Sequence, residues 1–207
     1  MVWPDFIGGL KSMSRLLLVC AALFAALLLA SCATLSREQC EAGDWRAIGF
    51  NDGADGRPAD RISSHAEACS EYGISVDNAL YQTGRAEGLR VYCRLSNAER
   101  KGRSGERYFG VCEGELGVAF ARVHAAGREV FNLEAELNSL DSEIDAKLAE
   151  LRRGDPTPEQ VAALTRELTI LQTERRVLEL RVRSADQSLS ALRRQEENRL
   201  SQADIAY

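Results

Sequence analysis

The sequence predicts a mainly α-helical protein, in which a small disulfide-linked helical domain is followed by a long antiparallel two-helix coiled-coil hairpin. Three observations lead to this fold class: an apolar N-terminal leader, four cysteines in the segment after it, and two heptad patterns separated by a short turn. The expected boundaries are 1–31 for the leader, 32–39 for a tether, 40–115 for the disulfide-linked domain and 116–203 for the hairpin, with its turn at 153–158.

The N-terminal segment has the pattern of a cleavable signal peptide. Lys11 and Arg15 supply positive charge before an unbroken apolar run that ends at Leu29, and small residues follow. A membrane-spanning helix needs roughly 20 apolar residues, and this run is shorter. We therefore expect cleavage after Ser31, which makes Cys32 the first residue of the mature chain.

The residues at the expected cleavage point, Leu29-Ala30-Ser31-Cys32, resemble the lipobox of bacterial lipoproteins, whose cysteine is lipidated through its sulfur. The resemblance implies an N-terminus that carries several acyl chains such as palmitate, which hold a protein firmly to a bilayer. Enteric bacteria mark inner-membrane retention with an aspartate after the cysteine, whereas Ala33 stands here. We therefore expect an anchor in the outer membrane, facing the periplasm. The alternative is an ordinary secretory leader with a cysteine at the cut by chance.

Removal of the leader leaves four cysteines besides the lipidated one: Cys40, Cys69, Cys93 and Cys112. An even number of cysteines in an oxidising compartment predicts disulfides. Four cysteines allow three pairings, and we expect the pairing of sequence neighbours, Cys40 with Cys69 and Cys93 with Cys112. The alternative is a metal site, because His65 and Cys69 would share one helix face. No CxxC or HxxxH motif accompanies them, so we expect no metal and no cofactor.

The charge balance bears on the kind of partner. The chain has 26 Lys and Arg against 31 Asp and Glu, a net charge of −5. It has no basic stripe interleaved with aromatic residues, which nucleic-acid-binding proteins show. We therefore expect no nucleic-acid partner.

The segment from Cys40 to about Leu116 is rich in turn residues. The stretch GDWRAIGFNDGADGRPADR contains Asp-Gly and Gly-x-Pro turn chemistry, so we expect a loop there. Helices are expected over Ile62–Tyr72, ended by Gly73, and over Asp77–Leu95. The stretch NAERKGRSGERYFGVCEG is expected to return to loop. A domain this small buries a limited core, so disulfides are the expected supplement.

An ordered set of residues runs through this segment: Trp45, Gly49, Asp52, Gly53, Gly56, His65, Cys69, Tyr81, Gly84, Arg85, Gly88, Leu89, Tyr92, Cys93, Gly102, Gly105, Tyr108 and Cys112. The set resembles a family of uncharacterised bacterial lipoproteins that share a cysteine-containing domain of unknown function. The resemblance covers roughly Cys40 to Phe131. It implies no known activity, so no functional residue is carried over from the family.

Three residues are candidates for ligand binding. Gly84-Arg85 and Gly127-Arg128 are two copies of a short repeated motif. The first interpretation is a helix-packing device in which glycine lets a neighbouring backbone approach. The alternative is an anion- or glycan-binding module in which Arg85 and Arg128 hold the ligand, because guanidinium groups match carboxylate and phosphate. A second alternative is an envelope hydrolase that uses His65. The chain has no Gly-x-Ser-x-Gly motif, so we assign no catalytic residue and favour a protein that is not an enzyme.

Two heptad patterns occupy the C-terminal part. The first comprises Val130, Leu133, Leu137, Leu140, Ile144 and Leu151, and the second comprises Val161, Leu164, Leu168, Leu171, Leu178, Val182, Ala185, Leu189 and Leu192. Such a narrow apolar seam is typical of coiled coils. Gly154 can end the first helix, and Thr157 to Gln160 provide a capping box for the second. The short connection predicts antiparallel helices, so that Leu200 returns to the level of Cys112. Arg175 interrupts the seam, and we expect its charge to suit docking.

Together these features predict a lipid-anchored periplasmic protein of the cell envelope with a structural or adaptor role. We expect it to bind another envelope protein, or a second copy of itself, through the coiled coil.

Overall fold

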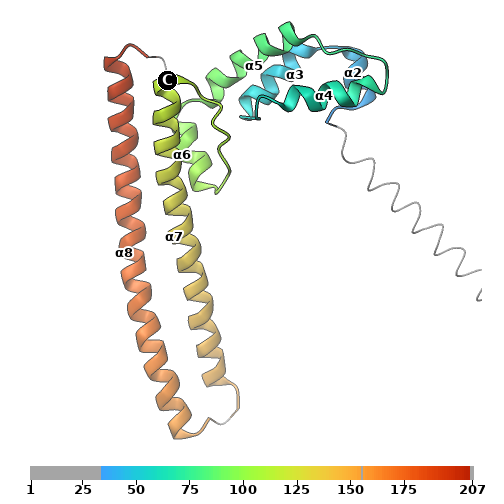
Figure 1. The fold of residues 1–207 in the computed structure, drawn as a ribbon. Helices are drawn as coiled ribbons and strands as arrows, with labels where there is room; N and C mark the ends of the chain where they lie inside the picture. Colours follow the sequence, from blue (N-terminus) through green and yellow to red (C-terminus); the bar gives the residue numbers. More distant parts are fainter. Residues whose placement is uncertain (1–33, 155, 206–207) are drawn as a thin grey trace, which may run out of the picture. The chain divides into compact units, whose positions relative to one another are not determined.

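The computed structural model describes residues 34–154 and 156–205. This part is helical and contains no strand, which confirms the predicted mainly α class (Figure 1). The helices are α2 (Arg37–Ala42), α3 (Trp45–Ala54), α4 (Arg61–Ser70), α5 (Asn78–Tyr92), α6 (Leu95–Arg103), α7 (Gly114–Arg152) and α8 (Pro158–Gln202). The described residues form two compact units, one with residues 34–44 and 60–78 and the other with residues 45–59 and 79–205. The domain boundary that we predicted between residues 115 and 116 falls in the first turn of α7 and stays a prediction.

The first unit contains α2 and α4, which the disulfide between Cys40 and Cys69 joins. Ser36 begins α2 with a capping box, in which its hydroxyl accepts from the backbone N–H of Gln39 and the Gln39 side chain accepts from the Ser36 N–H. Gly43 ends the helix at φ 63°, a left-handed conformation that glycine adopts at little cost. Both half-cystines are buried, so the cross-link forms part of the interior of this small unit.

The predicted loop after Asp44 is wrong, because residues 45–54 form α3. This helix packs directly on α5 through glycines that have no room for a side chain. A Cβ atom added at Gly49 would lie 2.0 Å from the carbonyl oxygen of Tyr81, and one added at Gly84 would lie 1.9 Å from that of Arg46. From the local sequence alone these glycines predict a turn. In the fold they instead allow two helices to cross closely.

The predicted loop after Leu95 is also wrong at its start, since Leu95–Arg103 form α6. Leu95 and Ala98 are fully buried, and α6 packs on α7. Two glycines meet at this contact, because a Cβ atom added at Gly127 would lie 3.0 Å from the Cα atom of Gly102. The segment is strongly polar in composition, and its helix is therefore stabilised by the burial of its few apolar residues.

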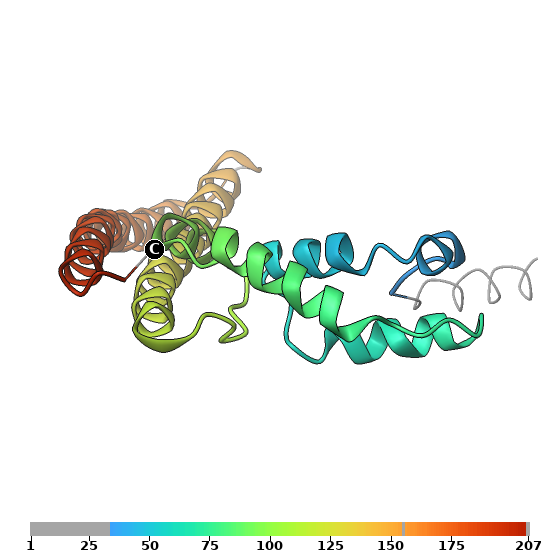
Figure 2. The same ribbon diagram turned by 90° about the horizontal axis from the view of Figure 1, so that it is seen from above.

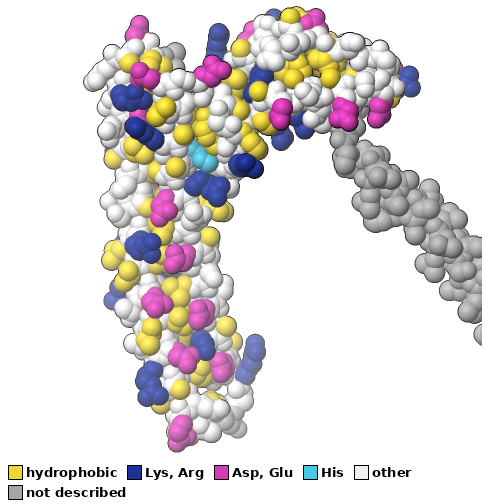
Figure 3. Space-filling model, viewed as in Figure 1, with side chains coloured by type: hydrophobic (Ala, Val, Ile, Leu, Met, Phe, Trp, Pro, Cys, Tyr) yellow, Lys and Arg dark blue, Asp and Glu magenta, His cyan; other side chains and the backbone are white. Residues whose placement is uncertain are grey.

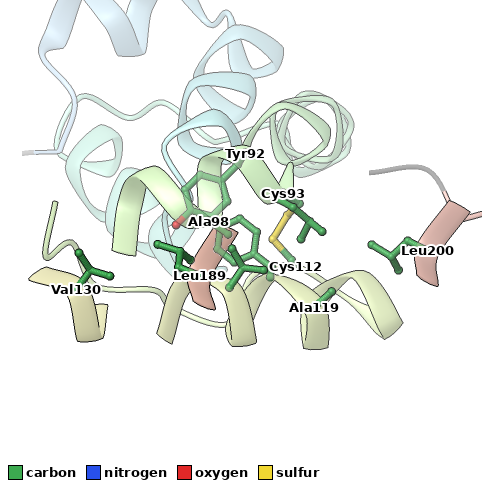
Figure 4. Close-up of a cluster of buried hydrophobic side chains, with 11 residues drawn as sticks. Tyr92, Cys93, Ala98, Cys112, Ala119, Val130, Leu189 and Leu200 are labelled. Atoms are coloured by element: carbon green, nitrogen blue, oxygen red, sulfur yellow. A yellow bond between two sulfur atoms is a disulfide. The ribbon is translucent and has the colours of Figure 1, made fainter. Parts of the chain in front are cut away.

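The main core of the second unit surrounds the disulfide between Cys93 and Cys112 (Figure 4). Tyr92 stacks on Phe120 of α7 with 5.3 Å between the ring centroids. The buried residues of this core are Tyr92, Cys93, Leu95, Ala98, Cys112, Ala119, Phe120, Val123, Val130, Leu189 and Leu200. Residues from α5 to α8 thus meet in one apolar cluster, which fixes the open end of the hairpin.

The two long helices α7 and α8 run side by side in both ribbon views (Figures 1 and 2). Gly154 lies in the connection at φ 77°, and Thr157 and Gln160 form the predicted capping box. Arg199 donates to Glu115 at 2.6 Å, so the end of α8 lies beside the start of α7 as predicted for an antiparallel pair. Val161 was predicted to lie in the seam but is 40 % exposed. It lies in the first turn of α8, next to the connection between the two helices. No helix in the described ranges is long and apolar enough to cross a membrane.

Candidate interaction surface

The predicted lipidation residue, Cys32, and the predicted signal peptide lie outside the described residues. The lipid anchor therefore stays a prediction. The four other cysteines form the two disulfides expected from their order in the sequence, Cys40–Cys69 in the first unit and Cys93–Cys112 in the second. The pairing is confirmed, and it consumes the thiol that a metal site with His65 would need. Among the residues that the structure describes, no three His, Cys, Asp or Glu side chains are grouped to hold a metal ion.

His65 lies on α4 and is 2 % exposed. Its Nδ1 atom is 2.8 Å from the hydroxyl of Thr34, a residue of the same unit. A side chain enclosed in this way is held by packing and by a hydrogen bond. The geometry therefore gives the hydrolase alternative no support from an open site around His65.

Arg85 lies on α5 at the crossing with α3, where a Cβ atom added at Gly53 would lie 2.3 Å from its carbonyl oxygen. Its side chain is 5 % exposed, and the Nη1 atom is buried without a hydrogen-bond partner. Arg128, on α7, donates from Nη1 to the carbonyl oxygen of Gly105 at 3.1 Å. The two arginines thus belong to separate contacts, one between α3 and α5 and the other between α7 and the turn that follows α6. This placement favours the helix-packing interpretation of the repeated Gly-Arg pair.

The charges on the hairpin seam are paired inside the hairpin. Arg175 donates to Asp141 across the pair at 2.5 Å and to Glu179 along its own helix at 2.7 Å. The expectation that this charge serves docking has no support here, because its Nε and Nη1 groups already have acceptors within the hairpin. An arginine at a narrow seam can reach such acceptors since its long apolar stem lies along the seam while its head extends to the edge.

A second charged group lies at the open end of the hairpin. Glu196 is 2 % exposed and accepts from Arg122 at 3.0 Å and from Arg199 at 2.8 Å. Burial by itself would raise the pKa of Glu196, but the hydrogen bonds from Arg199 and Arg122 outweigh it and hold the pKa below its ordinary value. The carboxylate is therefore part of the packing between the two helices.

The outer face of α8 carries a second apolar stripe that sequence reasoning missed. We call Ile170, Thr173, Val177, Leu180 and Ser184 the outer stripe. Ile170, Val177 and Leu180 are 59 %, 54 % and 60 % exposed, more than any other large hydrophobic residue in the described part of the chain. Their spacing alternates between three and four residues, as the seam does, but on the opposite side of the helix. The spacing of these residues can be recognised in the sequence. Only the structure shows that no described residue covers the outer stripe.

A groove of about 440 Å³ lies between α7 and α8 beside the outer stripe. Leu140, Val177 and Leu178 supply its apolar surface, and Glu136, Glu143 and Glu174 supply most of its charge. Acidic and basic side chains follow the hairpin along its visible face, with hydrophobic side chains between them (Figure 3). The hairpin therefore offers apolar surface in the middle of its length.

The fold and these surfaces define a helical protein with a coiled-coil hairpin. Within it, residues 44–129 match a family model described as a protein of unknown function (DUF2799), so a domain of that family extends from α3 into α7. The presence of a domain of unknown function, predicted from the ordered motifs, is confirmed. The chain matches no curated protein and no solved structure.

Proposed function

We propose that the protein is a lipid-anchored component of the bacterial cell envelope, attached through Cys32 to the outer membrane and facing the periplasm. In this proposal it acts as an adaptor that binds another envelope protein through its hairpin. Its DUF2799 domain would then belong to the lipoprotein family that the motifs resemble.

Two features support the location. The sequence Leu29-Ala30-Ser31-Cys32 fits a lipoprotein cleavage site. The described chain also contains two disulfides, which form and persist in oxidising compartments such as the periplasm.

The observation that carries the adaptor role is the outer stripe of α8. Three large hydrophobic side chains more than half exposed on one face of one helix are unusual for a surface that only contacts water. The helix that carries them has 45 residues and, at 1.5 Å per residue, is about 68 Å long. A long helix pair with apolar side chains in its middle is suited to bind a partner at a distance from the point of attachment.

The proposal is tested in cells with a photo-reactive amino acid at Val177. We expect a defined crosslinked protein in the outer-membrane fraction, identified by mass spectrometry. We also expect Cys32→Ser to prevent incorporation of a palmitate analogue and to release the protein from that fraction, because the thioether is the attachment point.

The matched control places the same photo-reactive group at Gln172, which is exposed on α8 but lies off the outer stripe. Equal capture from both positions would contradict the adaptor role. Unchanged membrane attachment of the Cys32→Ser variant would contradict the anchor.

A further inference from the structure

The outer stripe is bordered by positive charge that has no partner in the described chain. Four arginines lie in or beside the stripe and make no ion pair within residues 34–154 and 156–205: Arg166, Arg176, Arg181 and Arg183. Two acids of the same segment are already used, since Glu167 pairs with Lys147 and Glu179 pairs with Arg175. Within residues 166–184 Glu174 is the one acid without an ion pair, and Glu136 and Glu143 of α7, which line the groove together with Arg181, also form none. Residues 166–184 of α8, which carry the most exposed apolar side chains, thus have an excess of Arg over Glu in a protein of net charge −5.

The stripe has the geometry of a coiled-coil contact. Ile170, Val177 and Leu180 follow the alternation of three and four residues, with β-branched side chains at one position and leucine at the other. Thr173 lies between them, and its hydroxyl donates to the carbonyl oxygen of Thr169 at 2.8 Å. Because this hydroxyl is satisfied within the helix, a partner could cover Thr173 without leaving a polar group unpaired.

We infer that the outer stripe binds an amphipathic helix of another protein whose apolar face is bordered by Asp and Glu. This inference rests on the proposed adaptor function and specifies the chemistry of the partner. The apolar residues of the two helices would interdigitate, and acidic side chains of the partner would reach Arg176, Arg181 and Arg183. Charge complementarity of this kind selects a partner and steers its approach.

The same charges disfavour a second copy as the occupant. Two outer stripes placed face to face would bring Arg176 and Arg183 of both chains to one interface, and within residues 166–184 only Glu174 is an acid without an ion pair. Like charges across an interface act against such pairing. A lipid surface is also a poorer fit, because helices that lie in a membrane interface have a broad apolar face, whereas this stripe is narrow.

The inference is tested with two synthetic helical peptides of four heptads that have Ile and Leu at the apolar positions. One peptide has Glu at both flanking positions and the other has Lys. The full chain is purified, and binding of each peptide is measured by fluorescence anisotropy. We expect the Glu peptide to bind at least about fivefold more tightly than the Lys peptide, since several exposed ion pairs each contribute modestly.

Three variants sharpen the test, and each changes only exposed side chains, so helical circular dichroism should be unchanged. Val177→Asp should abolish binding of the Glu peptide, because it places a charge in the centre of the apolar contact. Gln172→Asp adds the same charge off the stripe and should leave binding within about twofold. The double variant Arg176→Glu with Arg183→Glu should reverse the preference, so that the Lys peptide binds more tightly.

Equal affinity for the two peptides, or an equal loss in the two aspartate variants, would overturn the inference. Dimerisation of the protein that Val177→Asp abolishes would assign the stripe to a second copy. Binding to phosphatidylglycerol vesicles that the same variant abolishes would assign it to a membrane surface. Peptide binding is measured without reference to the anchor, so failure of lipidation in cells leaves this result standing, and the reverse also holds.

Discussion

The α3–α5 crossing and the α7–α8 hairpin are two helix pairs built on opposite principles. At the crossing, glycines recur every fourth residue on both helices, Gly49 and Gly53 on one and Gly84 and Gly88 on the other, and each would direct a Cβ atom to within 2.3 Å of a carbonyl oxygen across the pair. In the hairpin, large side chains such as Leu168 and Leu189 fill the space between the helices. Backbone meets backbone in the first pair, and side chain meets side chain in the second.

The difference determines what each pair can tolerate. The hairpin accepts Arg175 and Glu196 near its seam, because long side chains reach paired acceptors or donors at the edge. The crossing has no room for one additional carbon atom, so its tolerance is set by hard contact between main chains. Three changes test this comparison.

The largest effect is expected for Gly84→Val on α5. The first added carbon atom would lie 1.9 Å from the carbonyl oxygen of Arg46, so the two helices must separate and lose their contact. We expect a loss of at least about 4 kcal/mol in the free energy of unfolding, measured by urea denaturation. The matched control is Thr83→Val at the neighbouring exposed position, which should cost less than about 1 kcal/mol. A small loss in Gly84→Val would contradict the close crossing.

A smaller loss is expected for Leu168→Asp in the hairpin seam. Leu168 is 7 % exposed, so the substitution removes apolar contact and buries a charge without a partner. We expect a loss of about 3 kcal/mol and a lower helical circular dichroism signal, with both disulfides still formed. Ile170→Asp is the control on the same helix, where 59 % exposure predicts a change below about 0.5 kcal/mol. Similar losses in the two variants would place the seam on the wrong face of α8.

The smallest of the three effects is the pH dependence that Glu196 contributes. Its pKa is lowered from 4.5 in the folded chain, so the stabilisation is present above pH 4.5 and is lost as the pH falls through the lowered pKa. We expect Glu196→Gln to cost about 1.5 kcal/mol at pH 7 and progressively less below pH 4.5. Urea midpoints of the wild-type protein and the variant should therefore converge on acidification. Glu134→Gln, on an exposed part of α7, is the control and should cost less than about 0.5 kcal/mol at pH 7.

Much of the architecture is predictable from short-range signals in the sequence. The capping box at Thr157 and the glycine at position 154 locate the hairpin turn, because these signals act within a few residues of chain. The structure pairs Cys40 with Cys69 and Cys93 with Cys112, the expected one of the three pairings that the sequence allows. Prediction fails for α3 and α6, because their glycine and polar residues favour loops when only neighbouring residues are considered.

The sequence by itself determined the helical class, the antiparallel hairpin and the motif at Cys32, because each depends on local periodicity, capping or order along the chain, whereas it left three disulfide pairings open. Only the tertiary structure decided that Gly49 and Gly84 serve a helix crossing, that Arg85 and Arg128 lie at separate contacts, and that nothing in the described chain covers the outer stripe. Close approach and exposure arise between segments far apart in the chain. The spacing of apolar residues along a helix indicates which of its faces can pack. Only the fold decides whether another segment lies against that face.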